Sequence, residues 1–163
     1  MTKRKAVLYI VLVTAMMALL STWGVAAGSG VFTEFTGYEA CTPVPGSLNI
    51  TPRDGNLHYE ETYNCVDTAS IPEVSGVLQP TVKGIFDAAT FSGPFTGSAH
   101  LTNAEGGWIE TSTGSLRDGV ASMRVHALGE GAYEGMQAWW DYTWPAGDMS
   151  HMTFTGCILD PHK

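Results

Sequence analysis

Four acidic residues in the second half of this 163-residue chain are the first candidates for chemistry: Glu110, Glu130, Glu134 and Asp141. Two carboxyl groups that face each other across neighbouring strands can share the roles of general acid and general base. An acidic β-protein offers many such pairs by chance, so this pattern alone assigns no catalytic residue.

A metal site is the second possibility. His58 and Glu60 stand two residues apart, and on a strand such residues point to the same face. The chain lacks the H-x-H, C-x-x-C and H-E-x-x-H spacings of established metal sites, and it lacks the G-x-S-x-G turn that presents a catalytic serine. We therefore expect a polar outer strand face here, with no metal and no cofactor.

Aromatic residues are the third possibility. The segment "YEGMQAWWDYTW" (133–144) holds five aromatic residues and a methionine, and Trp108 precedes it in the chain. Aromatic clusters at the mouth of a barrel bind apolar or sugar-like molecules, although the same side chains also fill ordinary cores. The residues predicted to lie nearest a ligand are Trp108, Tyr133, Trp139 and Trp140.

The elements that must position these residues are strands. After residue 27, Gly and Pro recur too often for helices, and the intervening segments are rich in Thr, Val and aromatic residues. Turn sequences such as "RDGN" (53–56) and "RDG" (117–119) separate them. The expected strands are 31–41, 46–51, 57–66, 74–91 (broken at Pro80), 94–102, 107–115, 120–128, 133–144 and 151–159. This pattern predicts an all-β fold, a single antiparallel up-and-down β-barrel of about eight strands, because a long meander must hide its edges.

A short repeat predicts which strand faces point inward. "FTG" occurs at 35–37, 95–97 and 154–156, and "YEG" at 133–135 resembles it. Glycine lets a strand coil tightly, and a neighbouring aromatic ring can cover the bare backbone. If the aromatic-glycine face is inward, alternation along 133–144 places Trp139 inside and Met136, Trp140, Tyr142 and Trp144 outside. Either a bulge near Trp139 and Trp140 reverses this register, or an aromatic stripe is exposed to a partner.

The N-terminal residues resemble a secretion signal. Lys3, Arg4 and Lys5 precede an apolar run (6–20) and small residues, and we expect cleavage after Ala27. The predicted organisation is a signal peptide helix at 1–27 and a barrel domain at 28–163, in a secreted, periplasmic or extracellular protein. An uncleaved N-terminal membrane anchor is the alternative.

Cleavage would leave five basic and sixteen acidic residues, a net charge of −11. Such a charge repels nucleic acid phosphates and anionic lipid headgroups, so neither nucleic acid nor a membrane surface is expected as a partner. Of the three cysteines, Cys41 and Cys65 flank a strand-turn-strand segment and form the preferred disulfide. Cys157 could instead reach Cys41 if the sheet closes.

Several motifs resemble a group of small secreted bacterial proteins with an allene oxide cyclase-like, lipocalin-like barrel. These motifs are "GGW" (106–108), the G-x-G-x-Y-x-G run from Gly129 to Gly135, and the closing Gly156, Ile158 and Pro161. The resemblance implies eight antiparallel strands around an apolar cavity. No stretch matches the active-site residues of the plant cyclases, so it implies no catalytic residue, and most of the bacterial relatives have no assigned function.

Three functions follow from these observations. The first is a secreted barrel that binds a small apolar or amphipathic molecule. The second is a non-catalytic module that self-associates through the stripe Met136, Trp140, Tyr142 and Trp144. The third is a cyclase or isomerase, which would need a titratable group in the cavity. Glu110 and Asp141 are the residues to substitute first in that case.

Overall fold

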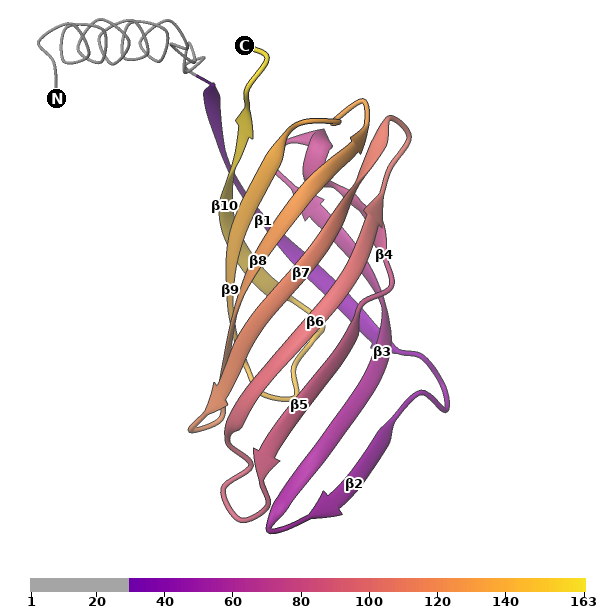
Figure 1. The fold of residues 1–163 in the computed structure, drawn as a ribbon, viewed down its shortest axis with the longest axis vertical. Helices are drawn as coiled ribbons and strands as arrows, with labels where there is room; N and C mark the ends of the chain where they lie inside the picture. The colour runs from indigo at the N-terminus through magenta and orange to yellow at the C-terminus, as the bar shows by residue number, and fades with distance from the viewer. Residues whose placement is uncertain (1–29) are drawn as a thin grey trace, which may run out of the picture.

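The structure is a computed structural model that describes residues 30–163, so the predicted signal peptide lies outside the described residues. The described chain forms ten strands and one short 3-10 helix, η1 (Figure 1). The strands are β1 (Val31–Pro43), β2 (Asn49–Arg53), β3 (Asn56–Ala69), β4 (Gly76–Leu78), β5 (Thr81–Asp87), β6 (Gly93–Thr102), β7 (Gly106–Arg117), β8 (Val120–Gly131), β9 (Gln137–Pro145) and β10 (Met152–Asp160), with η1 at Pro72–Val74.

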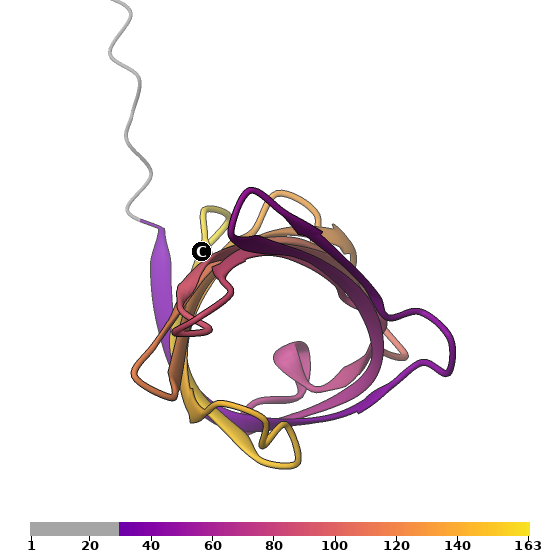
Figure 2. The same ribbon diagram turned by 90° about the horizontal axis from the view of Figure 1, so that it is seen from below.

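The predicted all-β barrel is confirmed. Neighbouring strands from β6 to β10 pair antiparallel in chain order, and β10 pairs with β1. The ring closes because β1 also pairs with β3, which continues through β4 and β5 to β6 (Figure 2). Eight strands make the closed barrel. The short strands β2 and β4 are additional: β2 follows β1 along one edge of β3, and β4 precedes β5 along the other.

Two hairpins have the turns that their sequences predict. Asp54 and Gly55 join β2 to β3, and Asp118 and Gly119 join β7 to β8. All four residues have a positive φ, between 50° and 79°. This conformation is a type I′ turn, whose twist matches that of the strands it connects and which favours Asp-Gly.

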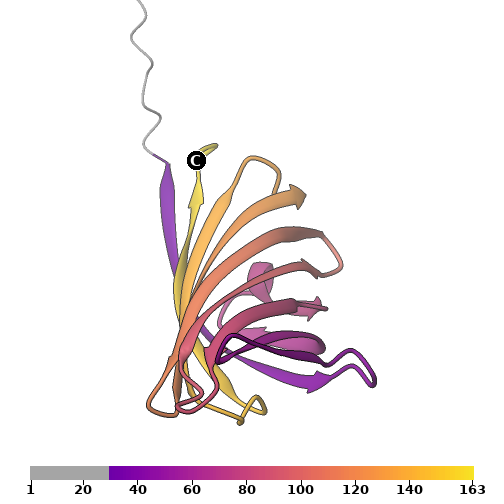
Figure 3. The same ribbon diagram turned by 60° about the horizontal axis from the view of Figure 1, so that its bottom comes forward.

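The two ends of the barrel differ. Helix η1 lies across the end where β1 begins and β10 ends, and Figure 2 shows it within the ring when the barrel is seen from the opposite end. Figure 3 shows β1 and β10 side by side along the wall. No helix within residues 30–163 is long and apolar enough to span a membrane.

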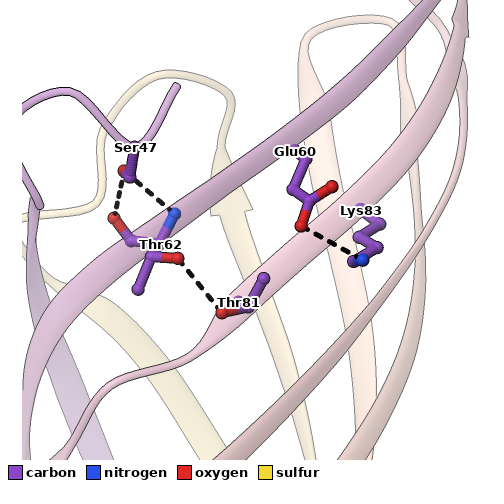
Figure 4. A network of polar contacts seen from close by, with 5 residues as sticks. All are labelled: Ser47, Glu60, Thr62, Thr81 and Lys83. Atoms are coloured by element: carbon purple, nitrogen blue, oxygen red, sulfur yellow. Dashed lines mark hydrogen bonds and ion pairs between the residues drawn. The ribbon is translucent and has the colours of Figure 1, made fainter. Parts of the chain in front are cut away.

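A polar network fixes the loop between β1 and β2 to the barrel wall (Figure 4). The Ser47 hydroxyl donates to the Thr62 carbonyl at 3.0 Å and accepts from the Thr62 N–H at 3.1 Å. The Thr62 hydroxyl lies 3.1 Å from that of Thr81 on β5, and Lys83 pairs with Glu60 at 3.1 Å. These contacts lie on the outer face, which leaves the inward row of β3 free for the interior.

The aromatic-glycine repeat acts between β1 and β10 as the sequence predicts. Phe35 is the register partner of Gly156, and Gly37 is the register partner of Phe154. A Cβ on Gly37 would lie 2.4 Å from the Phe154 ring, and one on Gly156 would lie 2.8 Å from the Phe35 ring. Each ring therefore covers the glycine backbone of the opposite strand, and this reciprocal packing requires glycine at both positions.

We expect Gly156→Ala to destabilise the fold far more than Gly97→Ala. A Cβ at position 156 would lie 2.2 Å from the Trp139 carbonyl oxygen and 2.5 Å from Trp140 Cβ, neither of which can move freely. At position 97 its only contact under 3 Å is the Ser112 hydroxyl, which can rotate. Urea unfolding should show a loss of about 2–3 kcal/mol for Gly156→Ala, in the range of overpacked cores, and under 1 kcal/mol for Gly97→Ala. Equal losses would contradict this account.

The predicted facing of β9 is wrong. Ala132–Gly135 forms the turn between β8 and β9, so β9 begins at Gln137 and the alternation does not pass through from Tyr133. Trp140, Tyr142 and Trp144 point into the barrel, whereas Trp139 and Asp141 point outward. Neither a bulge at Trp139 nor an exposed aromatic stripe is present on β9. The turn at Ala132–Gly135, which ends before β9 begins, is what reverses the inward and outward faces of β9.

The predicted disulfide between Cys41 and Cys65 is confirmed. The two residues are register partners on β1 and β3, so the bond crosses the strand pair that closes the barrel. Cys157 is a free, half-buried thiol on β10. Disulfides persist in oxidising compartments, so this bond suggests an extracytoplasmic location.

Candidate binding cavity

The barrel contains a cavity of about 250 Å³. Its walls are mostly aromatic and aliphatic, and three methionines add adaptable surface. The residues that line it include Tyr59, Tyr63, Phe86, Phe91, Phe95, Tyr142, Trp144, Leu78, Val82, Leu116, Val125, Met123, Met149 and Met152. Such walls favour an apolar molecule, since burying apolar surface is the main source of binding free energy in pockets of this kind.

The cavity opens at the end opposite η1. Phe91, from the loop between β5 and β6, and Gly147, from the loop between β9 and β10, both line it. Phe91 has a left-handed backbone (φ 52°), held by its N–H, which donates to the Asp87 carbonyl at 2.8 Å. Its ring stacks on Phe86 with 5.4 Å between centroids and is half exposed. This ring is therefore the part of the wall that a molecule entering from solvent meets first.

The other end of the barrel is filled by side chains. Trp108 and Tyr133 stack at 5.3 Å, and Trp108 Nε1 donates to the Glu73 carbonyl of η1 at 2.8 Å. The Tyr133 hydroxyl donates to Asn103 at 3.1 Å, and Val74 is fully buried. These contacts close the barrel at this end, so the cavity has its mouth at the other.

Three carboxyl groups converge in the interior from three strands. Glu39 on β1 is the register partner of Asp67 on β3, and Glu110 enters from β7. The exposed fractions of Glu39, Asp67 and Glu110 are 4%, 2% and 6%. The Tyr142 hydroxyl donates to Glu39 Oε2 at 2.9 Å. Glu39 and Glu110 line the cavity, whereas Asp67 lies behind Glu39.

Burial disfavours the charged form of these groups. Burial, together with the smaller effect of the nearby Glu39 carboxyl, raises the pKa of Glu110 to about 8. It raises the pKa of Asp67 to about 10, with additional contributions from Glu39 and Glu110. The pKa of Glu39 is also raised, mainly by burial, although the Tyr142 hydroxyl acts in the opposite direction. The cluster therefore holds protons near neutral pH.

A fourth buried carboxyl, Glu61, differs because it has donors. The hydroxyl groups of Tyr59 and Tyr63, on the same inward row of β3, both hydrogen-bond to Glu61 Oε2. Burial and these contacts raise the pKa of Tyr63 to about 12 and raise that of Tyr59 as well. Glu61 is therefore satisfied within the wall, unlike Glu110.

The four residues predicted nearest a ligand are not brought together. Trp108 and Tyr133 meet in the closed end of the barrel. Trp140 is buried in the wall against Phe35, with 5.9 Å between ring centroids, and Trp139 lies on the outer face, stacked on His126. None of the four lines the cavity.

The residues predicted for self-association are not exposed as a stripe on the barrel surface. Trp140, Tyr142 and Trp144 are buried in the interior of their own chain, and Tyr142 and Trp144 line the cavity. Met136 is partly buried and packs against the core. These side chains pack against the core of their own chain and do not form an exposed surface.

Of the four acidic candidates, only Glu110 points into the barrel. Glu130 pairs with His100 at 2.9 Å on the outer surface, and Glu134 lies exposed in the turn before β9. Asp141 forms a two-point ion pair with Arg124, at 2.8 and 2.9 Å, also outside. A titratable group in the cavity is thus present at Glu110 and absent at Asp141.

The pair His58 and Glu60 lies on the outer row of β3, where Glu60 pairs with Lys83. Within residues 30–163, one group of potential metal ligands is close enough to share an ion: Glu39, Cys41 and Cys65. Both of its cysteines are in the disulfide, so it offers no thiolate for a metal.

Glu39 and Asp67 were not identified from the sequence, although a signal for them exists. Each lies two residues from a disulfide cysteine, Glu39 before Cys41 and Asp67 after Cys65. Two cysteines paired across antiparallel strands place their i−2 and j+2 neighbours opposite each other on the same face. The predicted disulfide therefore implied the Glu39–Asp67 pair, but not that its face points inward.

No protein-family model matches this chain, and no curated protein matches it either.

Proposed function

We propose that this protein binds a small apolar or amphipathic molecule inside its barrel. The observation that carries the proposal is the cavity of about 250 Å³ with aromatic and methionine walls and a mouth between two loops. A rigid wall that is already formed lowers the cost of binding, because few side chains must be ordered by the ligand.

The likeness to secreted barrels of the allene oxide cyclase-like group belongs to the same proposal. The closed eight-stranded barrel agrees with that architecture, and the disulfide agrees with an extracytoplasmic protein. We propose that the mature protein is exported and acts as a binding protein, with its ligand entering past Phe91.

A substitution that fills the cavity tests the proposal. Ala99 on β6 lines the cavity beside Glu110, its register partner, so Ala99→Leu adds three carbon atoms to the interior. We expect it to weaken binding of toluene or 2-phenylethanol, measured by ligand-observed NMR, at least about tenfold, which is about 1.4 kcal/mol. The matched control is Thr96→Leu on the outer face of the same strand, which should change the affinity less than about twofold.

Native mass spectrometry of the protein purified from its own host gives an independent test. A monomer with additional small-molecule mass would support the proposal and identify the ligand. The proposal fails if the protein carries no such mass and neither toluene nor 2-phenylethanol binds, or if they bind equally well to Ala99→Leu.

A further inference from the structure

The carboxyl cluster at the cavity has no basic partner. Within residues 30–163, no Lys, Arg or His lines the cavity, whereas Glu39 and Glu110 do. Most buried carboxyl groups in proteins are paired with a cation or surrounded by hydrogen-bond donors. In their ionised form these carboxyl groups therefore have no cationic partner among the described residues that line the cavity.

Counting donors leads to the same conclusion. The Tyr142 hydroxyl is used by Glu39, and Glu39 Oε1 lies 2.8 Å from the Cys41 sulfur, which is oxidised and has no proton to donate. Glu110 Oε1 is buried and has no hydrogen-bond partner among the described residues, and the same holds for both oxygens of Asp67. A proton shared between Glu39 and Asp67 would give that pair a hydrogen bond but would leave Glu110 Oε1 without one. Once Glu110 is ionised, it is therefore an acceptor without a donor.

We propose that the ligand is a small hydrophobic amine whose ammonium group binds Glu110, with Glu39 next to it. A primary ammonium supplies three N–H donors and a positive charge, which are the two things that the cluster lacks. The hydrocarbon or aromatic part of the molecule lies against Phe95, Met123 and Trp144, toward the mouth. Carboxylates and other anions are rejected, because the cluster repels negative charge. This assignment rests on the function proposed above.

The affinity should then depend on pH with a defined sign. The titratable groups that face Glu110 are Glu39 on β1, Asp67 on β3 and Tyr142 on β9, all of which are acids. Its register partners Ala99 on β6 and Ala127 on β8 do not titrate. The pKa of Glu110 is about 8, and an ammonium binds its ionised form. Binding below that pH must release a proton, so the affinity should fall by up to about tenfold per pH unit.

The test compares three molecules of one shape: 2-phenylethylamine, 2-phenylethanol and phenylacetate, titrated calorimetrically into the purified protein near pH 8.5. We expect the amine to bind at least about tenfold more tightly than the alcohol, and phenylacetate to bind more weakly than both. Glu110→Gln should bring the affinity for the amine to within about twofold of the affinity of the same variant for the alcohol. The control is Glu34→Gln, the same change at an exposed position of β1, which should retain the preference.

The outcomes separate this inference from the function on which it rests. Equal binding of amine and alcohol, or an amine preference that survives Glu110→Gln, would overturn the amine assignment while the binding function stands. Binding of none of the three would overturn the amine assignment, and it would overturn the binding function as well if toluene does not bind and the purified protein carries no small-molecule mass. If Glu110→Gln does not fold, the unaltered protein decides the question. An amine affinity that is the same near pH 6.5 and pH 8.5 would overturn the assignment.

Discussion

The free energy of unfolding is expected to fall as the pH rises from about 4 to about 10. Folding raises the pKa of Glu110 from 4.5 to about 8, and that of Asp67 from 3.8 to about 10. In this interval the folded protein binds more protons than the unfolded chain, so stability decreases with increasing pH. The stabilisation that these bound protons give the folded protein is complete below the pKa values of the unfolded chain. It is lost as the pH rises through about 8 for Glu110 and through about 10 for Asp67.

The effect should be large for a single residue. A shift of one pKa unit corresponds to about 1.4 kcal/mol, so the burial of Glu110 as a carboxylate costs on the order of 5 kcal/mol at alkaline pH. Total stabilities of domains are only about 5–15 kcal/mol. Glu110→Gln and Asp67→Asn should therefore stabilise the protein at pH 9, and each should flatten the pH profile.

Urea unfolding at a series of pH values checks this prediction. Glu34→Gln is the matched control, because it makes the same chemical change on the exposed row of β1 and should leave the slope unaltered. Below about pH 4 a different effect enters. The lowered pKa of Asp141, which is caused first by its hydrogen bonds from Arg124, makes stability fall with decreasing pH there. A profile that is flat or rising between pH 5 and pH 9 would contradict the burial of uncompensated carboxyl groups.

Replacing both Cys41 and Cys65 by Ala is expected to cost about 3–4 kcal/mol of stability. The bond joins residues 24 positions apart, and closing a loop of this length in the unfolded chain removes about 3.5 kcal/mol of conformational freedom. It also links β1 to β3, the strand pair that closes the barrel. Opening this seam exposes strand edges as well as core, so the loss should appear in cooperative unfolding of the whole barrel.

Denaturation with and without a reducing agent provides the measurement. Reduction should lower the urea midpoint of the unaltered protein and have no further effect on the double variant. Cys157→Ala removes the free thiol of β10 and should change stability by less than about 1 kcal/mol. A double variant as stable as the unaltered protein would show that the barrel closes without help from the bond.

The strands were predictable because their signals are local. The alternation along β3 places Tyr59, Glu61, Tyr63, Cys65 and Asp67 on one face, and the Asp-Gly turns require a positive φ that few other residues adopt. The repeat also predicts that an aromatic ring covers a glycine backbone, as Phe35 covers Gly156. Each of these features depends on residues a few positions apart, or on one pair of similar motifs.

The facing of β9 could not be predicted in the same way. Alternation carries through a strand but not through a turn, and the turn at Ala132–Gly135 lies within a segment whose composition is that of a strand. Starting the alternation at Tyr133, which lies in the turn, placed Trp139 on the inside and Trp140, Tyr142 and Trp144 on the outside. Among the predicted ligand residues, this error bears on Trp139, which lies on the outer face.

The sequence by itself determined the all-β class, the near-complete strand order and two hairpin turns, and it favoured the Cys41–Cys65 bond over one between Cys41 and Cys157. Only the tertiary structure decided which acids are buried. Glu39, Asp67 and Glu110 are separated by up to 71 positions in the chain, and they meet because the ring of strands closes. The chemistry of the cavity is a consequence of that closure, since a carboxyl group acquires a shifted pKa and a missing partner only when distant strands remove it from water.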